Sequence, residues 1–204
     1  MIAAEPSVFV VDDDAALRKA VARLLKSAGF RVETLATAED FLRRPVPPPP
    51  SCIVLDLCMP GLDGLELQRT LAERHSLLPI IFISGHGDIP TSVRAMKAGA
   101  LDFLPKPFED ENLLAAVRRA LGRHAANCQE QTEAEELRRR AGALSPRQRE
   151  VMALVVTGML NKQAGHQLRV SEKTIKAHRG QVMRKMKADS LADLVRMAQK
   201  LGVQ

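Results

Sequence analysis

The amino-acid sequence predicts an α/β domain built on a five-stranded parallel sheet, followed by a small all-α domain. Five short apolar segments alternate with helical patterns over residues 1–121, whereas residues 144–204 contain helical patterns alone. Charge divides the chain in the same way. Residues 1–121 carry 14 Lys+Arg against 16 Asp+Glu, and residues 145–204 carry 12 against four. A basic module behind an acidic one is typical of a protein that binds a polyanion such as nucleic acid.

The first domain alternates strand and helix along its whole length. Its predicted strands are 7–11, 30–37, 52–57, 79–84 and 101–105. Its predicted helices are 16–29, 38–44, 64–75, 89–100 and 109–121. The first helix shows the pattern clearly, because Leu17, Val21 and Leu24 recur at helical spacing and Gly29 ends it. Such alternation indicates a parallel sheet that is covered by helices on both faces.

Charged and polar side chains follow four of the predicted strands. They are Asp12, Asp13 and Asp14 after the first strand, and Asp56, Ser84 and Lys106 at the ends of the third, fourth and fifth. Ligands of parallel sheets gather at the carboxyl ends of the strands, so we expect these side chains to converge. Clustered carboxylates repel one another, and a bound cation would offset that repulsion. The sequence therefore predicts a Mg²⁺ site, with Mn²⁺ as the alternative ion.

A carboxylate beside a metal ion and a lysine fits phosphoryl transfer. Asp56 would attack phosphorus, while Lys106, Ser84 and the ion would stabilise the phosphoryl oxygens. No strong general base is placed for rapid turnover, which favours a phosphoryl group that stays on the protein. A hydrolase with Asp56 as its nucleophile is the competing interpretation. The familiar phosphatase pattern has a second Asp two residues after the first, where this chain has Cys58.

The segments "VVDDD", "CIVLDLCMPGLDG", "IIFISGHGD" and "DFLPKPF" resemble the receiver domain of two-component response regulators, over nearly all of residues 6–121. The resemblance implies a flavodoxin-like (βα)5 domain over residues 1–121, with Asp56 as phosphoacceptor and Lys106 as its phosphate-pairing lysine. It implies a metal site made of Asp12, Asp13, Asp56 and the backbone carbonyl of Cys58, and it leaves Asp14 solvated.

The resemblance also implies two switch residues, Ser84 and Phe103. Ser84 supplies the hydroxyl that moves toward the phosphoryl group. Phe103 occupies the position of the aromatic switch residue, which is often Tyr in the family. Since Phe has no hydroxyl group, the outer hydrogen bond of an active state is not available to this chain.

Residues 122–143 are polar and are expected to form a linker that is helical over 130–141. The second domain, 144–204, is predicted to contain helices over 145–158, 161–168, 171–186 and 190–202, with Ser145, Asn161 and Ser171 as the caps of the first three. Pro146 and Gln148 follow the first cap in the pattern of a capping box. The second and third helices, joined by a tight turn, predict a helix-turn-helix.

This second domain resembles the LuxR-type helix-turn-helix, and the whole chain resembles a FixJ-type regulator. The recognition helix is expected over 172–186, with Ile175, Val182 and Met186 in the core. The residues expected to contact DNA are Lys162, Lys173, Thr174, Lys176, Arg179, Gly180 and Arg184. A solvated basic surface is the alternative for each of them.

Two stretches depart from the family pattern: Ala164, Gly165 and His166, where the family tends to have a larger aliphatic residue followed by small ones, and Arg169 in the turn. Gly165 inside a helix costs about 0.5–1 kcal/mol relative to Ala. Arg169 stands where the turn often carries Gly, and it would have to adopt a left-handed conformation. We therefore expect a softer helix here.

The resemblance implies a transcription regulator that is not an enzyme, apart from slow self-phosphorylation and autodephosphorylation. A sensor histidine kinase would phosphorylate Asp56, and this would control homodimerisation and sequence-specific binding to double-stranded promoter DNA. Activation is the family-based expectation, with RNA polymerase as a candidate partner. The alternative is a regulator that works without phosphate and uses the receiver as a protein-interaction module.

The sequence further predicts a cytoplasmic protein with no membrane partner. The N-terminus lacks a signal-peptide pattern, and no apolar run approaches the ~18 residues of a membrane span. The three cysteines, Cys52, Cys58 and Cys128, have no metal-ligand spacing and fit a reducing compartment.

Overall fold

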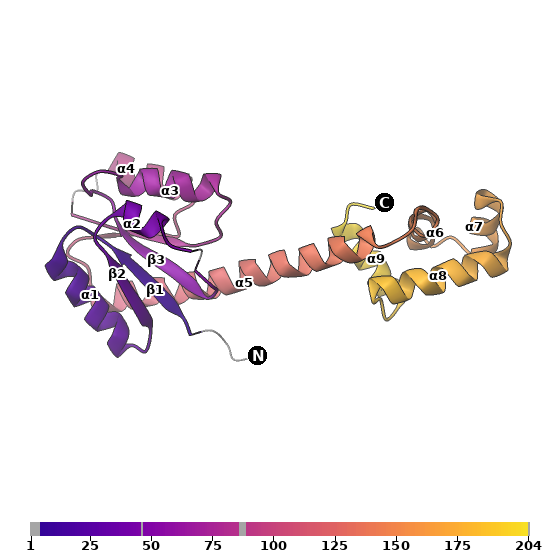
Figure 1. Ribbon diagram of the computed structural model, residues 1–204, viewed down its shortest axis with the longest axis horizontal. Coiled ribbons are helices and arrows are strands. Elements are labelled where there is room, and N and C mark those ends of the chain that lie inside the picture. Colours follow the sequence, from indigo (N-terminus) through magenta and orange to yellow (C-terminus); the bar gives the residue numbers. More distant parts are fainter. Residues whose placement is uncertain (1–4, 46, 86–88, 204) are drawn as a thin grey trace. The chain divides into compact units, whose positions relative to one another are not determined.

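The computed structural model describes residues 5–45, 47–85 and 89–203, and it divides into two compact units, residues 1–129 and 130–204 (Figure 1). The strands are β1 (Ser7–Val11), β2 (Arg31–Leu35), β3 (Ser51–Asp56), β4 (Ile80–Ser84) and β5 (Asp102–Pro105). The helices of the first unit are α1 (Ala15–Ser27), α2 (Ala38–Leu42), α3 (Gly64–Glu73) and α4 (Ile89–Lys97). Helix α5 (Asp110–Gly142) begins in the first unit and ends in the second. The second unit continues with α6 (Pro146–Val156), α7 (Asn161–Leu168), α8 (Glu172–Met186) and α9 (Leu191–Lys200).

The first unit is built on the predicted parallel sheet. Its strand order is β2-β1-β3-β4-β5, and every neighbouring pair is parallel. Helices α2, α3 and α4 cover one face, and α1 and α5 cover the other (Figure 1). Successive strand residues point to opposite faces, so Phe9 and Val11 join the first layer while Val8 and Val10 join the second. The predicted α/β fold is confirmed, and the order places the ends of β1 and β3 side by side.

Asp14 has a structural role that the sequence analysis did not assign. Instead of being merely solvated, it is the N-cap of α1. Its Oδ1 accepts hydrogen bonds from the backbone amides of Ala16 (2.8 Å) and Leu17 (3.2 Å). These bonds hold the pKa of the Asp14 carboxyl below its usual range. The exposed third aspartate therefore starts the helix that follows the carboxylate cluster.

Helix α5 differs most from expectation, because it runs without a break from Asp110 to Gly142. The helix predicted over 130–141 is confirmed, but residues 122–129 are helical as well. The sequence analysis ended this helix at Leu121, where the apolar pattern stops. A polar stretch can remain helical through local pairs, however, and Arg140 binds Glu136 one turn earlier at 2.8 Å. Leu121 lies in a core of the first unit and Leu137 in that of the second. None of the helices in the described residues is both long and apolar enough to span a membrane.

The second unit contains the predicted helix-turn-helix in α7 and α8. Ser145 and Ser171 cap α6 and α8 as predicted, but the prediction that Asn161 caps α7 is wrong. Asn161 is instead the first residue of α7, and its Oδ1 accepts a hydrogen bond from Arg179 at 3.3 Å. Ile175 is buried in the core with Val182 and Met186, as expected. The helix-turn-helix is thus packed on an aliphatic core.

The turn between α7 and α8 explains both departures from the family pattern. Arg169 adopts the expected left-handed conformation, with φ 55° and ψ 43°. Gly165 is buried, and an added Cβ would lie 2.9 Å from the carbonyl oxygen of Val170. Glycine therefore allows the backbone of the turn to approach α7 closely. The loss in helix propensity accompanies a tight turn, and the softer helix stays a prediction.

Candidate functional site

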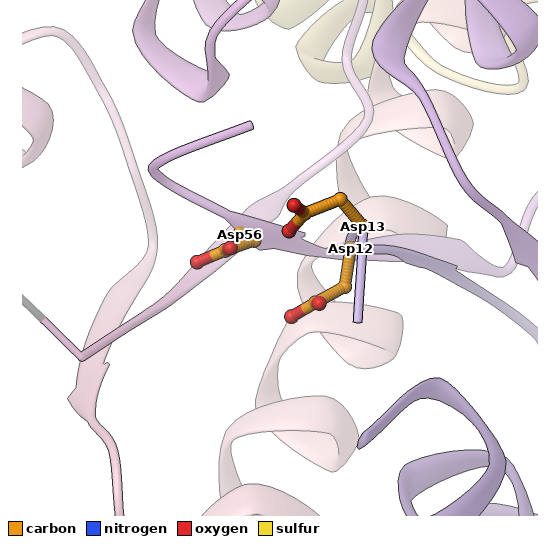
Figure 2. Close-up of side chains that lie close together, drawn as sticks. All are labelled: Asp12, Asp13 and Asp56. Atoms are coloured by element: carbon orange, nitrogen blue, oxygen red, sulfur yellow. The ribbon is translucent and has the colours of Figure 1, made fainter. Parts of the chain in front are cut away.

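Three carboxylates meet at the carboxyl edge of the sheet. Asp12 follows β1, Asp56 ends β3, and the pairing of Val11 with Leu55 brings the two side by side. One carboxylate oxygen of each of Asp12, Asp13 and Asp56 lies within 4.8 Å of the others. Figure 2 shows the three carboxyl groups directed toward a common region. The sheet topology thus assembles the predicted acidic cluster.

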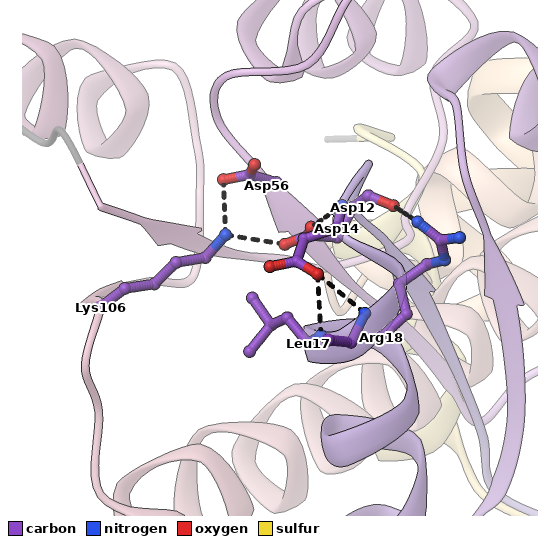
Figure 3. Close-up of polar contacts among 7 residues, drawn as sticks. Asp12, Asp14, Leu17, Arg18, Asp56 and Lys106 are labelled. Atoms are coloured by element: carbon purple, nitrogen blue, oxygen red, sulfur yellow. Dashed lines mark hydrogen bonds and ion pairs between the residues drawn. The ribbon is translucent and has the colours of Figure 1, made fainter.

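Lys106 joins this cluster from the loop after β5. Its Nζ lies 2.7 Å from Oδ2 of Asp12 and 3.2 Å from Oδ1 of Asp56 (Figure 3). Its backbone amide donates to the carbonyl oxygen of Ser84 at 2.8 Å, which extends the pairing of β4 with β5 by one step. The lysine is therefore fixed both at its backbone and at its charged end.

Asp12 is held more tightly than its neighbours. It is fully buried, and its Oδ1 accepts a hydrogen bond from the backbone amide of Asp14 at 2.8 Å. The guanidinium group of Arg18, in the first turn of α1, donates to the carbonyl oxygen of Asp12 (Figure 3). Arg18 was not predicted for this site, because its only signal in the sequence is a basic residue six positions after Asp12. These contacts fix the position of Asp12 within the cluster.

Burial and charge shape the electrostatics of the site. Burial raises the pKa of Asp56, and the nearby Asp12 carboxylate raises it further, while Lys106 acts in the opposite direction. Burial alone would lower the pKa of Lys106, but its hydrogen bond to Asp12 and the two negative charges raise it above its usual value. Lys106 thus remains a cation, and the three carboxylates can accommodate further positive charge. A buried carboxylate beside a fixed cation is suited to attack an electrophile that carries anionic oxygens.

The remaining residues predicted for this site surround the cluster. Ser84 is buried at the end of β4. Phe103 is half-buried in β5, and its ring packs against that of Phe82 with centroids 6.4 Å apart. Cys58 lies two residues after Asp56 with an exposed side chain. Phe103 is therefore already in partial contact with the core.

Most of the residues predicted to contact DNA are exposed on α7 and α8. The exposed ones are Lys162 on α7 and Lys173, Lys176, Gly180 and Arg184 on α8. Thr174 and Arg179 are half-buried and have protein partners. The Thr174 hydroxyl lies 2.8 Å from that of Ser171, and Arg179 binds Asn161 on α7. Of the predicted DNA contacts, these two therefore also stabilise the helix-turn-helix itself.

Comparison with known protein families covers both units. The family described as "Response regulator receiver domain" matches residues 8–118. The family described as "Bacterial regulatory proteins, luxR family" matches residues 142–198. These two ranges contain the carboxylate cluster and the helix-turn-helix, respectively.

Similar proteins match over almost the full chain. Nodulation protein W of Bradyrhizobium diazoefficiens is 47% identical over 96% of this chain and 86% of its own length. Transcriptional regulatory protein FixJ of Azorhizobium caulinodans is 45% identical over 96% of this chain and 93% of its own.

Solved structures match over the same extent. The response regulator StyR is 44% identical with a TM-score of 0.89, covering 97% of this chain and 100% of that one. Full-length FixJ from B. japonicum is 40% identical with a TM-score of 0.57, covering 97% and 98%. Receiver and DNA-binding domains together imply a kinase and DNA as partners. The chain belongs to the FixJ-type two-component response regulators of transcription, with a receiver domain followed by a LuxR-type DNA-binding domain.

Proposed function

We propose that Asp56 accepts a phosphoryl group from a sensor histidine kinase, and that this controls dimerisation and promoter binding. The observation that carries the proposal is the position of Lys106, whose Nζ lies 3.2 Å from Asp56 and 2.7 Å from Asp12. This places a fixed cation beside the carboxylate whose single negative charge would be replaced by the roughly two negative charges of an acyl phosphate. A solvated turn of aspartates would not bind a half-buried lysine in this way.

The donor set fits Mg²⁺. Asp12, Asp13 and Asp56 offer three carboxylate oxygens within 4.8 Å of one another, and hard divalent ions prefer oxygen ligands. The backbone carbonyl of Cys58 is the fourth proposed donor, and Mn²⁺ would accept the same set. When bound, the ion would neutralise charge on the transferring phosphoryl group.

The residues of the chain supply the rest of the proposed chemistry. An Asp56 oxygen attacks phosphorus, the P–N bond to the kinase histidine breaks, and the imidazole leaves with the bonding electron pair. Lys106 then shifts toward the new phosphoryl oxygens, and the Ser84 hydroxyl donates to one of them. The ring of Phe103, already packed against Phe82, turns further into the core. Self-phosphorylation and autodephosphorylation stay slow because, among the described residues, no strong base is placed beside Asp56.

Dimerisation is the proposed link to DNA. Two paired receivers bring two copies of α8 to two half-sites, which multiplies a weak single-site affinity. On each copy, the exposed Lys173, Lys176 and Arg184 of α8 would contact bases and phosphates, and Lys162 would contact phosphate. The regulator would act as an activator in the cytoplasm, where promoter DNA and RNA polymerase are found.

The test follows oligomeric state and DNA binding together. Wild type, Asp56→Asn and Lys106→Ala are compared with and without acetyl phosphate and Mg²⁺, by light scattering and by gel shift. The gel-shift probe is a duplex enriched from a random library by the treated wild type. Only the wild type should dimerise and gain affinity on treatment. Dimerisation and DNA binding by treated Asp56→Asn equal to those of the treated wild type would contradict the proposal. If the wild type bound DNA equally well with and without acetyl phosphate, the phosphate-independent regulator would be favoured.

A further inference from the structure

The C-terminal end of the recognition helix α8 is bound by a residue far away in the sequence. Helix α8 closes on Lys187, which has a left-handed conformation with φ 56°. The turn satisfies the carbonyl of Met183 through the amide of Ala188 at 3.0 Å. The carbonyl of Met186, the last helical residue, accepts a hydrogen bond from a guanidinium nitrogen of Arg140 at 3.2 Å. A charged donor at this end also complements the helix dipole.

Arg140 is itself fixed in place. Its Nε donates to Glu136 at 2.8 Å, and its side chain is 24% exposed. Leu137, on the same two turns of α5, is buried in the core of the second unit together with Met186. The last turns of α5 are therefore part of the DNA-binding unit, and Arg140 is oriented toward α8 before any ligand binds.

A second group of hydrogen bonds joins the same two regions. Lys185, in the last turn of α8, donates to the carbonyl of Ala143 at 2.8 Å and to the side chain of Gln148 at 2.9 Å. Gln148, at the start of α6, donates in turn to Gln181 at 2.7 Å. The C-terminal half of α8 is thus anchored to the end of α5 and the start of α6, while Arg179 anchors its N-terminal half to α7.

We propose that Arg140 is a positioning residue for DNA readout, which fixes the angle of α8 through the Met186 carbonyl. This rests on the proposed function, because it assumes that α8 reads base edges. Lys176 and Arg184 lie on the exposed side of the same rigid helix, so a change of its angle would shift both. Side chains must be placed more accurately to contact base edges than to contact phosphates. The preference for one DNA sequence over another should therefore decrease before the overall affinity for DNA does.

The experiment compares full-length Arg140→Met with the matched control Arg139→Met. Arg139 also binds Glu136, but its side chain is 77% exposed, and among the described residues Glu136 is its side-chain partner. Arg140→Lys keeps a charged donor and tests for rescue. Each protein, treated with acetyl phosphate and Mg²⁺, is titrated with two duplexes: one enriched from a random library by the wild type, and one of the same composition in scrambled order.

The readout is the ratio of the two affinities, which a merely structural role would not change. Arg140→Met should lower this ratio about tenfold, the scale of a single misread base pair, whereas Arg139→Met should stay close to wild type. Arg140→Lys should recover most of the loss. Thermal unfolding of each variant accompanies the titrations.

Two results would overturn the positioning role. One is a ratio for Arg140→Met equal to that for Arg139→Met, and the other is an equal loss on both duplexes together with a lower unfolding temperature. If the wild type itself enriched no sequence, the proposed function would fall, and the role of Arg140 with it. That outcome is separate, because it appears before any Arg140 variant is made.

Discussion

Replacing Gly165 with Ala should destabilise the second unit, although helix propensity alone predicts the opposite. In a helix interior, Ala is favoured over Gly by about 0.5–1 kcal/mol. Here an added Cβ would lie 2.9 Å from the oxygen of Val170, 3.5 Å from the nitrogen of Glu172 and 3.6 Å from the carbonyl carbon of Ser171. All three are backbone atoms, two of the turn between α7 and α8 and one of the first residue of α8, so they cannot move aside as the end of a side chain could.

The sign of the change in stability follows from comparing the steric cost of the added methyl with the gain in helix propensity. Forcing an extra methyl into a packed site costs about 1–3 kcal/mol, which outweighs the gain in propensity and leaves a net loss of up to about 2.5 kcal/mol. Gly180 in α8 is the matched control, because a Cβ there would meet nothing within 4 Å. Gly180→Ala should therefore stabilise the unit by the full propensity gain, about 0.5–1 kcal/mol.

Native-state hydrogen exchange of peptides from α6 to α9 gives the free energy of unfolding of this unit in the intact chain. The chain contains no Trp or Tyr, so intrinsic tryptophan fluorescence cannot follow it. Opposite signs for the two variants support the close approach of the turn. If Gly165→Ala stabilised the unit as much as Gly180→Ala does, the steric reasoning would be refuted.

Three further predictions concern other parts of the chain. Burial lowers the pKa of His124, whose Nδ1 accepts a hydrogen bond from the Ser51 amide at 2.9 Å. The unfolded state then binds more protons, so urea melts should show the first unit losing stability as pH falls through about 6.5, and His124→Asn should remove this slope. Arg169→Gly should stabilise the second unit by about 1 kcal/mol by relieving a left-handed side-chain residue, whereas Arg169→Ala should give no such gain in the same exchange experiment. Asp13→Asn should weaken Mg²⁺ binding at least about tenfold by calorimetry, and unchanged affinity would remove Asp13 from the metal site.

The sequence was sufficient to predict the α/β fold and the grouping of the acidic site. Parallel strands bring their carboxyl ends to one edge, so residues that directly follow strands can be grouped without knowing the strand order. The structure does bring Asp12, Asp13, Asp56 and Lys106 together. The order that makes β1 and β3 neighbours was needed to place Asp12 directly beside Asp56.

Features that depend on distant contacts could not be predicted in the same way. The continuity of α5 rests on local polar pairs, which leave no apolar period to detect. The bond from Arg140 to Met186 joins residues that only tertiary packing brings together. The steric role of Gly165 could not be predicted for the same reason, because its helix propensity is a local property and its close contact with Val170 is not.

The most direct test of the central claim is the intact mass of the protein after incubation with Mg²⁺ and acetyl phosphate, beside Asp56→Ala. We expect the wild type to gain the mass of one phosphoryl group and Asp56→Ala to gain none. The Lys106 amine, fixed 3.2 Å from Asp56, is the structural reason to expect this. A wild type that stays unmodified while folded and supplied with Mg²⁺, or an equal gain by Asp56→Ala, would contradict the assignment of Asp56 as the phosphoacceptor.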